Sequence, residues 1–235
     1  MTEFVIREHF VNILRGWIGR NERDGSHNLI IDTYNSMRKL PRNYAVTYTD
    51  AWCAATVSAA AIEAGLTDII PRECSCASMI VLYKAIGRWQ EQDDYVPLPG
   101  DVIFYDWNDS GKGDCTGSPE HVGVVEKVTD GLITVIEGNY HDAVGRRNIA
   151  VNGRFIRGYG VPDYAALAST GVINVGDTVT FTGNRQYANS YETAPASSAK
   201  PCKAEVTLIR EDRAHPYHIR GEGVYGWVDA TDILK

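Results

Sequence analysis

Cys53 and His121 are the residues of this sequence whose types and settings best suit covalent chemistry. Cys53 stands between Asp50 and an alanine-rich run, 54–61, which predicts a helix that stops near Gly65. Asp50 is a good N-cap, which would make Cys53 the third helical residue. There, the helix dipole and unpaired amides favour the nucleophilic thiolate. The alternative is a structural cysteine on a core helix, since free cysteines are often buried.

A nucleophilic cysteine needs a base, and the base needs a third group that orients it. Of the six histidines, His121 opens a predicted strand, and Gly123 leaves space on the same face. The next strand ends with Glu137 and Asn139. A three-residue hairpin loop, 129–131, would pair His121 with Asn139 and Gly123 with Glu137. A two-residue loop would turn both polar groups to the other face. We choose the longer loop because it assembles a site; otherwise Glu137 and Asn139 are strand-end turn residues.

The elements around these residues change from helices to strands along the chain. Apolar residues at helical spacing predict helices over 3–19, over a segment that Ser26 caps and Pro41 ends, and over 75–87. Runs rich in β-formers predict strands at 102–105, 121–128, 132–137 and 153–159. Helices first and antiparallel strands second predict an α+β domain.

The composition changes again near residue 165. We expect a first domain over 1–165, a linker over 166–171 and a second domain over 172–235. The second domain carries strand-like segments at 178–182, 204–209, 218–220 and 225–228, and an exposed loop over 184–202. Several strands in so short a segment predict a small all-β barrel.

Composition excludes some partners and compartments. The chain of 235 residues has a net charge of −7 and no run of Lys or Arg, which argues against nucleic acid or an anionic membrane as the main partner. No window approaches 18 consecutive apolar residues, so we expect no membrane insertion. The N-terminus lacks a signal-peptide pattern, so we expect synthesis in the cytoplasm. The five cysteines are expected to be free thiols. Cys74 and Cys76 are too close together for a zinc-binding pair.

Several motifs together resemble the CHAP family, cysteine- and histidine-dependent amidohydrolases and peptidases of the papain-like NlpC/P60 group. They are Asp-Ala-Trp-Cys-Ala-Ala at 50–55, Pro-Gly-Asp-Val-Ile-Phe-Tyr at 99–105, His-Val-Gly-Val-Val-Glu at 121–126 and Ile-Glu-Gly-Asn at 136–139. The resemblance implies a papain-like fold over 1–165, with N-terminal helices and an antiparallel sheet. It also implies that Cys53 is the nucleophile, His121 the base, Glu137 its orienter and Asn139 an auxiliary polar group.

The family cleaves amide bonds of bacterial peptidoglycan, so this is the substrate that the resemblance implies. The protein would cleave either the bond between muramic acid and the first alanine, as an N-acetylmuramoyl-L-alanine amidase, or a peptide bond, as an endopeptidase. Many members are phage endolysins or autolysins. The lack of a signal peptide favours an endolysin that acts on the wall after a holin opens the membrane.

The second domain resembles the SH3-like modules that bind cell walls, through Val-Gly-Asp-Thr-Val at 175–179 and Gly-Trp-Val-Asp-Ala at 226–230. Its aromatic residues could form a surface for peptide or glycan, or be barrel core. Trp52 is a further candidate for substrate contact. The aromatic candidates of the second domain are Tyr187, Tyr191, Tyr217 and Trp227.

A metal site and other functions stay open. The reaction needs no cofactor, but the acidic segment 106–114 could bind calcium through Asp106, Asn108, Asp109 and Asp114. The alternative without a metal is a solvated loop beside the substrate groove. The protein could also be a wall-binding protein without catalysis, or a papain-like amidase or transpeptidase that acts on another amide.

Overall fold

The computed structural model describes residues 2–168, 173–210 and 213–234. The chain forms two compact units, residues 7–163 and residues 1–6 with 164–235. The predicted linker, 166–171, lies partly outside the described residues, so the domain limits stay predictions. None of the described helices is long and apolar enough to cross a membrane.

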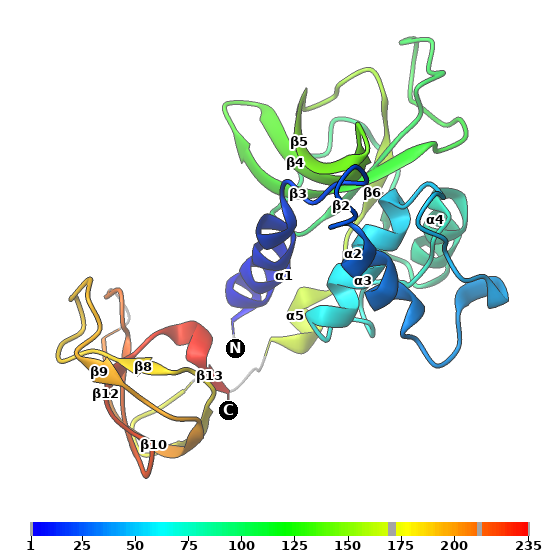
Figure 1. Cartoon of the computed structure of the whole chain (residues 1–235). Coiled ribbons are helices and arrows are strands. Elements are labelled where there is room, and N and C mark those ends of the chain that lie inside the picture. Colours follow the sequence, from blue (N-terminus) through cyan, green and yellow to red (C-terminus); the bar gives the residue numbers. More distant parts are fainter. Residues whose placement is uncertain (1, 169–172, 211–212, 235) are drawn as a thin grey trace. The chain divides into compact units, whose positions relative to one another are not determined.

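Four α-helices precede the sheet (Figure 1). Helix α1 buries Phe10, Val11 and Leu14, the apolar stripe that its sequence predicts. Ser75 caps α4 by accepting a hydrogen bond from the Ser78 amide (3.4 Å). The helices are α1 (Glu3–Trp17), α2 (Asn28–Asn35), α3 (Cys53–Glu63) and α4 (Cys76–Ala85).

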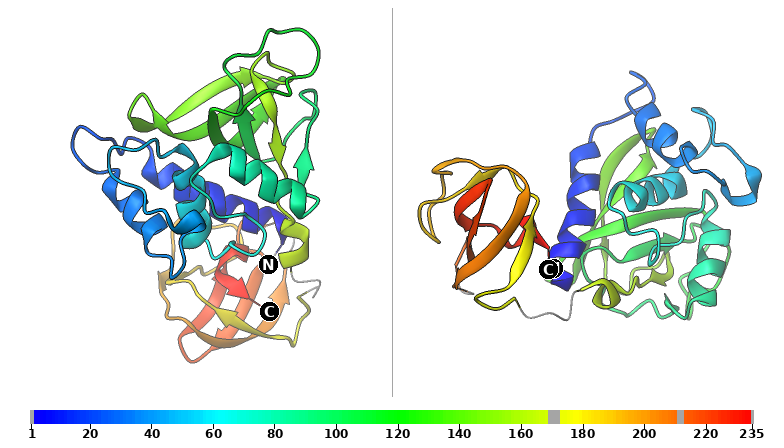
Figure 2. Two further views of the ribbon diagram at one scale, coloured as in Figure 1. Left: turned by 90° about the vertical axis from the view of Figure 1, so that its right-hand side faces the viewer. Right: turned by 90° about the horizontal axis from the view of Figure 1, so that it is seen from below.

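A six-stranded antiparallel sheet follows, in the order β1-β6-β2-β3-β4-β5. Helix α3 packs on β3 and β4 and beside α2 (Figures 1 and 2). This arrangement confirms the predicted α+β class. The sequence analysis missed β1 and β5. The strands are β1 (Trp89–Gln90), β2 (Val102–Tyr105), β3 (His121–Thr129), β4 (Leu132–Tyr140), β5 (Ala143–Ala150) and β6 (Ile156–Gly160).

The hairpin between β3 and β4 has a two-residue loop, so the predicted three-residue loop was wrong. Thr129 pairs with Leu132, and the loop residues Asp130 and Gly131 have φ values of 52° and 74°. Positive φ at both positions matches a type I′ turn, whose twist suits a tight hairpin. The turn lies within the predicted loop, 129–131, but it is one residue shorter.

A β-bulge restores the register on which the predicted site depends. The pairing shifts by one residue between Val125 and Lys127, and Val124 then pairs with Ile136. This is the register that a three-residue loop would have produced. Glu126, the extra residue, is buried and accepts hydrogen bonds from Arg146 (2.6 and 2.9 Å) and Arg15 (2.8 Å).

Gly123 is where the two strands leave no room for a side chain. A Cβ at this position would lie 2.6 Å from Val135 Cγ1 and 2.7 Å from Glu137 Cγ. We expect Gly123→Ala to lower the free energy of unfolding by about 1–3 kcal/mol, because the core must shift to fit it. Urea denaturation measures this. Gly16→Ala, on open helix surface, is the control and should be neutral or slightly stabilising. Equal stability of the two variants would contradict the tight packing.

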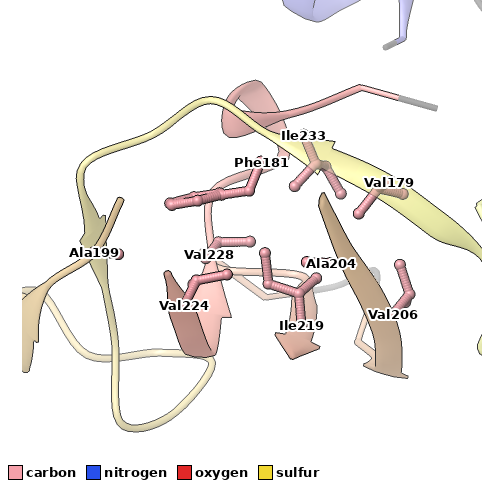
Figure 3. Packing of buried hydrophobic residues seen from close by; sticks show 9 residues of the cluster. All are labelled: Val179, Phe181, Ala199, Ala204, Val206, Ile219, Val224, Val228 and Ile233. Carbon is pink, nitrogen blue, oxygen red and sulfur yellow. The ribbon is translucent and has the colours of Figure 1, made fainter. Parts of the chain in front are cut away.

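The second unit contains a five-stranded antiparallel sheet in the order β12-β11-β10-β7-β13. Its core gathers Phe181, Val206, Ile219 and Val228 with smaller apolar side chains (Figure 3). No pairing between β12 and β13 closes this sheet in the described part of the chain. The strands are β7 (Thr178–Phe181), β10 (Cys202–Ile209), β11 (Tyr217–Gly221), β12 (Val224–Val228) and β13 (Ile233–Leu234).

The segment 184–202 is not the continuous exposed loop that its composition predicts. It contains a short two-stranded ladder, β8 (Arg185–Gln186) with β9 (Ser197–Ser198). Ala199 after this ladder is buried in the core of the unit. The prediction failed because Ser and Ala are weak strand formers, and pairing decides such segments more than composition does.

Candidate active site

Cys53 is the first residue of α3, and Trp52 is the N-cap. The prediction that Asp50 caps this helix was wrong. The Asp50 carboxylate accepts hydrogen bonds from the Thr47 amide (2.7 Å) and the Tyr44 hydroxyl (2.9 Å), which closes a turn before the helix. Cys53 still lies at the positive end of the helix dipole, two positions earlier than expected.

Small side chains let the sheet approach α3 closely. All the residues from Cys53 to Ala61 are buried. A Cβ on Gly138 of β4 would overlap the Thr56 side chain, so only glycine fits where the strand crosses the helix. The alanine-rich run therefore holds Cys53 in a fixed position against the sheet.

Cys76, the first residue of α4, lies beside the candidate nucleophile. Its Sγ is 3.8 Å from the Sγ of Cys53. The hydrogen bond with Cys76 is the largest cause that lowers the pKa of Cys53 well below its usual value, and His121 lowers it further. The pKa of Cys76 is raised, because its thiol interacts with Cys53 and is buried. Sequence reasoning considered Cys76 only as a zinc ligand and missed this contact.

Glu137 connects His121 to an arginine. Its Oε2 lies 3.0 Å from Nε2 of His121. Nε of Arg147 donates to both Glu137 oxygens, at 2.8 and 3.0 Å. Although full burial opposes ionisation, hydrogen bonds from His121 and Arg147 lower the pKa of Glu137. Glu137 is thus a buried carboxylate with both oxygens paired, as an orienting group requires.

The imidazolium form of His121 and the thiolate form of Cys53 stabilise each other. Burial alone would lower the pKa of His121, but hydrogen bonds with Cys53 and Glu137 raise it to about 9. Since Glu137 takes Nε2, Nδ1 is the nitrogen left to interact with the thiol. Both shifts act in the same sense, because the lowered pKa of Cys53 favours a thiolate and the raised pKa of His121 favours an imidazolium.

We expect Glu137→Gln to move the alkaline limb of the pH–rate profile to lower pH. Glu137 raises the pKa of His121, so its loss lets the imidazolium deprotonate earlier as the pH rises. We also expect kcat/KM to fall by about 10²-fold. The assay is kcat/KM from pH 5 to 10. Asp101→Asn removes another buried carboxylate, which pairs with Arg7 instead of His121, and should keep the limb near pH 9. An unshifted limb in Glu137→Gln would contradict the assignment.

A pocket of about 270 Å³ opens beside His121. It is lined by Trp107, His121, Asn139, Tyr140, His141 and Arg147. Asn139 therefore lines the same pocket as His121. Its Nδ2 donates to Glu22 Oε1 (3.1 Å), which also accepts from Nε1 of Trp52 (2.8 Å). Sequence reasoning missed Glu22, because it lies far from Asn139 along the chain.

Arg147 and Trp107 were also missed. Arg147 lies on β5, which the sequence analysis did not predict. The available signal was a third hairpin strand after His141 and Asp142, whose φ values of 51° and 60° form another two-residue turn. Trp107 follows β2 and stacks on Tyr105, with a ring distance of 4.9 Å.

The aromatic residues predicted to bind substrate divide into buried and exposed ones. Trp52 is fully buried. Tyr187 is also buried, and its ring stacks on that of His215 with 3.4 Å between the ring centres, so neither side chain offers a contact surface. Both predictions are corrected: these side chains pack internally. Tyr217 packs against the core of the second unit. Tyr191 is 67% exposed, and Trp227 is half-buried.

The four predicted calcium ligands do not form a cage. Asp106 accepts from the Asn108 amide (2.9 Å), and Asp109 accepts from the Gly111 amide (2.6 Å), so both carboxylates close their own loop. Within the described ranges, no group of three or more His, Cys, Asp or Glu side chains is arranged to hold a metal ion. Asp114 lies elsewhere, in a pocket with Asp93. The calcium site stays a prediction that this arrangement does not favour.

Comparison with known proteins supports the predicted resemblance. The family model for the CHAP domain matches residues 43–139, a range that includes Cys53, His121, Glu137 and Asn139. Two solved structures are similar, each with a TM-score of 0.34. One is "The crystal structure of Ly7917", with 15% identity over 77% of this chain and 90% of that chain. The other is "The crystal structure of Ly7917 with the hydrolyzing product of MDP", with 14% identity over 95% and 92%. No curated protein matches.

Proposed function

We propose that this protein is a peptidoglycan hydrolase that cleaves an amide bond through Cys53, His121 and Glu137. The observation that carries the proposal is the chain of contacts at the start of α3. Cys53 interacts with His121, and His121 is bonded to Glu137 at 3.0 Å. The CHAP domain match over residues 43–139 supports the same reaction class.

In the acylation step, the Cys53 thiolate attacks the carbonyl carbon of the amide. The carbonyl oxygen becomes an oxyanion, and the first amides of α3, which have no acceptor within the helix, are placed to stabilise it. Protonated His121 gives its Nδ1 proton to the leaving nitrogen, so the amine departs neutral. Cys53 is then held as a thioester.

In the deacylation step, neutral His121 takes a proton from water. The hydroxide that forms attacks the thioester carbonyl, and the thiolate leaves as the carboxylic acid product departs. Glu137 and Arg147 do not exchange protons with the substrate. They hold the imidazole with Nε2 occupied and Nδ1 free for both transfers.

We propose that the second unit binds the cell wall and that the whole protein acts as an endolysin. Tyr191 and Tyr225, each 67% exposed, and half-buried Trp227 supply aromatic surface for glycan or peptide. The net charge of −7 argues against nucleic acid as a partner. A holin would release such a protein to the wall, without direct contact.

Digestion of purified bacterial walls tests the proposal. We expect free carboxyl and amino groups to appear together in equal amounts. Mass spectrometry of the fragments then identifies the cut bond. A free muramic acid carboxyl group identifies an N-acetylmuramoyl-L-alanine amidase, and new peptide termini identify an endopeptidase. Wall binding with no new amino groups would overturn the proposal in favour of a binding protein.

A further inference from the structure

The Arg147 side chain uses only part of its hydrogen-bonding capacity. Its Nε is bonded to Glu137, but no acceptor among the described residues bonds its two terminal nitrogens. These nitrogens belong to a side chain that is 26% exposed and lines the pocket beside His121. A partly buried guanidinium with free donors is built to pair with an anion, which it binds through two parallel hydrogen bonds.

Aromatic rings fix the guanidinium in this position. Its carbon lies 4.7 Å from the ring centres of Trp107 and Tyr140 and 5.5 Å from that of Tyr105. These ring contacts and the bonds to Glu137 order a guanidinium that lines the pocket. A side chain that is already ordered loses little entropy when it binds a ligand.

We propose that Arg147 binds a free carboxylate of the substrate next to the amide that is cut. This inference rests on the proposed function and narrows it to acidic peptidoglycan stem peptides. The carboxylate would lie in the pocket, within reach of the terminal nitrogens of Arg147. The scissile carbonyl would then lie between His121 and Cys53. Arg147 has two roles in this account: it positions Glu137 and it selects the substrate.

Arg146 provides a matched control on the same strand. It pairs with Glu126 instead of Glu137, and it does not line the pocket. Successive strand residues point to opposite faces, so the two arginines differ in direction but not in charge. Arg146→Gln and Arg147→Gln therefore change the net charge equally.

The test compares a purified muropeptide with the same muropeptide whose free carboxylates have been converted to carboxamides. We expect wild type to show kcat/KM about tenfold higher or more for the acidic form, the range of a charged hydrogen bond. Arg147→Gln should slow both substrates, because Glu137 loses a partner, and should bring their ratio close to one. Arg146→Gln should keep the wild-type ratio. A ratio near one in wild type, or an unchanged ratio in Arg147→Gln, would overturn the inference.

A binding measurement separates this inference from the proposed reaction. Cys53→Ala is titrated by calorimetry with the two forms of the muropeptide, alone and combined with Arg147→Gln. Tighter binding of the acidic form that depends on Arg147 supports the carboxylate subsite without any turnover. If wild type hydrolyses neither form, the proposed function fails. If the two forms bind alike, the subsite fails even where hydrolysis occurs.

A separate observation concerns the two sulfurs at the helix starts. Cys53 and Cys76 are free cysteines 3.8 Å apart, on the first residues of α3 and α4. A disulfide requires an S–S distance of about 2.05 Å, so a small movement would join them. We infer that Cys76 protects the nucleophile by forming a reversible disulfide with it when a hydroperoxide oxidises Cys53.

The oxidation balances in two steps. The Cys53 thiolate attacks hydrogen peroxide: an S–O bond forms, the O–O bond breaks and hydroxide leaves, which gives the sulfenic acid. The Cys76 thiol then attacks the Cys53 sulfur: the S–S bond forms, the S–O bond breaks and water leaves with the Cys76 proton. Peroxide gains two electrons, and the two cysteines lose them. The disulfide prevents further oxidation to the irreversible sulfinic acid.

Peroxide treatment followed by a dithiol reductant tests this inference. We expect wild type to lose activity, to lose two hydrogens in mass, and to regain activity on reduction. Cys76→Ser should keep its initial activity in part, but lose it irreversibly with a gain of two oxygens on Cys53. Cys74→Ser, a neighbouring control, should behave like wild type. Sulfinic acid in wild type, or equal recovery in Cys76→Ser, would overturn the inference.

Discussion

Replacing Cys53 with alanine is expected to abolish the release of amino groups from purified walls. The substitution removes the sulfur that forms the thioester, so the rate should fall by about 10⁴-fold or more. Digestion of walls by wild type and variant, with the amines quantified, measures this loss. Cys202→Ala, a change of the same type in the second unit, should retain the wild-type rate.

The same substitution should leave the fold intact. Cys53 opens a helix that is already alanine-rich, and alanine is the best helix former. Circular dichroism and the thermal midpoint of Cys53→Ala should therefore resemble those of wild type. Retained turnover in a folded Cys53→Ala protein would refute the thioester mechanism. If Cys53→Ala lost both turnover and structure, Cys53→Ser would be measured instead, because serine keeps the size of the side chain.

Replacing His121 with alanine should have the second-largest effect, a loss of about 10³-fold or more in kcat/KM. Two causes act together. The leaving amine loses its proton donor, and the Cys53 thiolate loses the imidazolium that stabilises it. Turnover of a soluble muropeptide near neutral pH measures the effect.

His9→Ala is the control for this substitution, because His9 is exposed on α1. It should leave the rate unchanged. If His121→Ala retained more than about a tenth of the wild-type rate, His121 would not be the general acid, since such a group contributes at least about 10²-fold.

Much of the fold could be predicted because local pattern and packing agree. The periodicity of α1 and the apolar run of β2 specify those elements on their own. The start of α3 could not be placed to the residue. Asp50 suits an N-cap, but the same carboxylate also closes a turn with Thr47, and the turn prevails.

The strand register at the candidate site matches the predicted one although the predicted hairpin loop was wrong. The two-residue loop at Asp130 would have placed Glu137 on the opposite face, but the bulge at Glu126 reverses the shift. A bulge depends on the partners of its extra residue, here Arg15 and Arg146. These partners are distant along the chain, so the sequence pattern alone does not reveal them.

The role of Arg147 could not be predicted from the sequence, for a related reason. β5 alternates exposed residues with half-buried ones and has few large apolar side chains, a weaker signal than the apolar strands provide. Its role depends on Glu137, which faces it across β4 and β5. Residues that act through a partner strand become visible only when the register is known.

The central claim is that Cys53 is a thiolate paired with protonated His121. The pH dependence of Cys53 alkylation by iodoacetamide, followed by mass spectrometry of the Cys53 peptide, tests it most directly. The account predicts that the wild-type rate stays nearly constant from pH 9 down to neutral, because the pKa of Cys53 is lowered. In His121→Ala the rate should start to fall at a higher pH than in wild type, by about tenfold per pH unit below the new pKa, because a group that lowers the pKa of Cys53 is lost. A wild-type rate that falls in the same way would contradict the account.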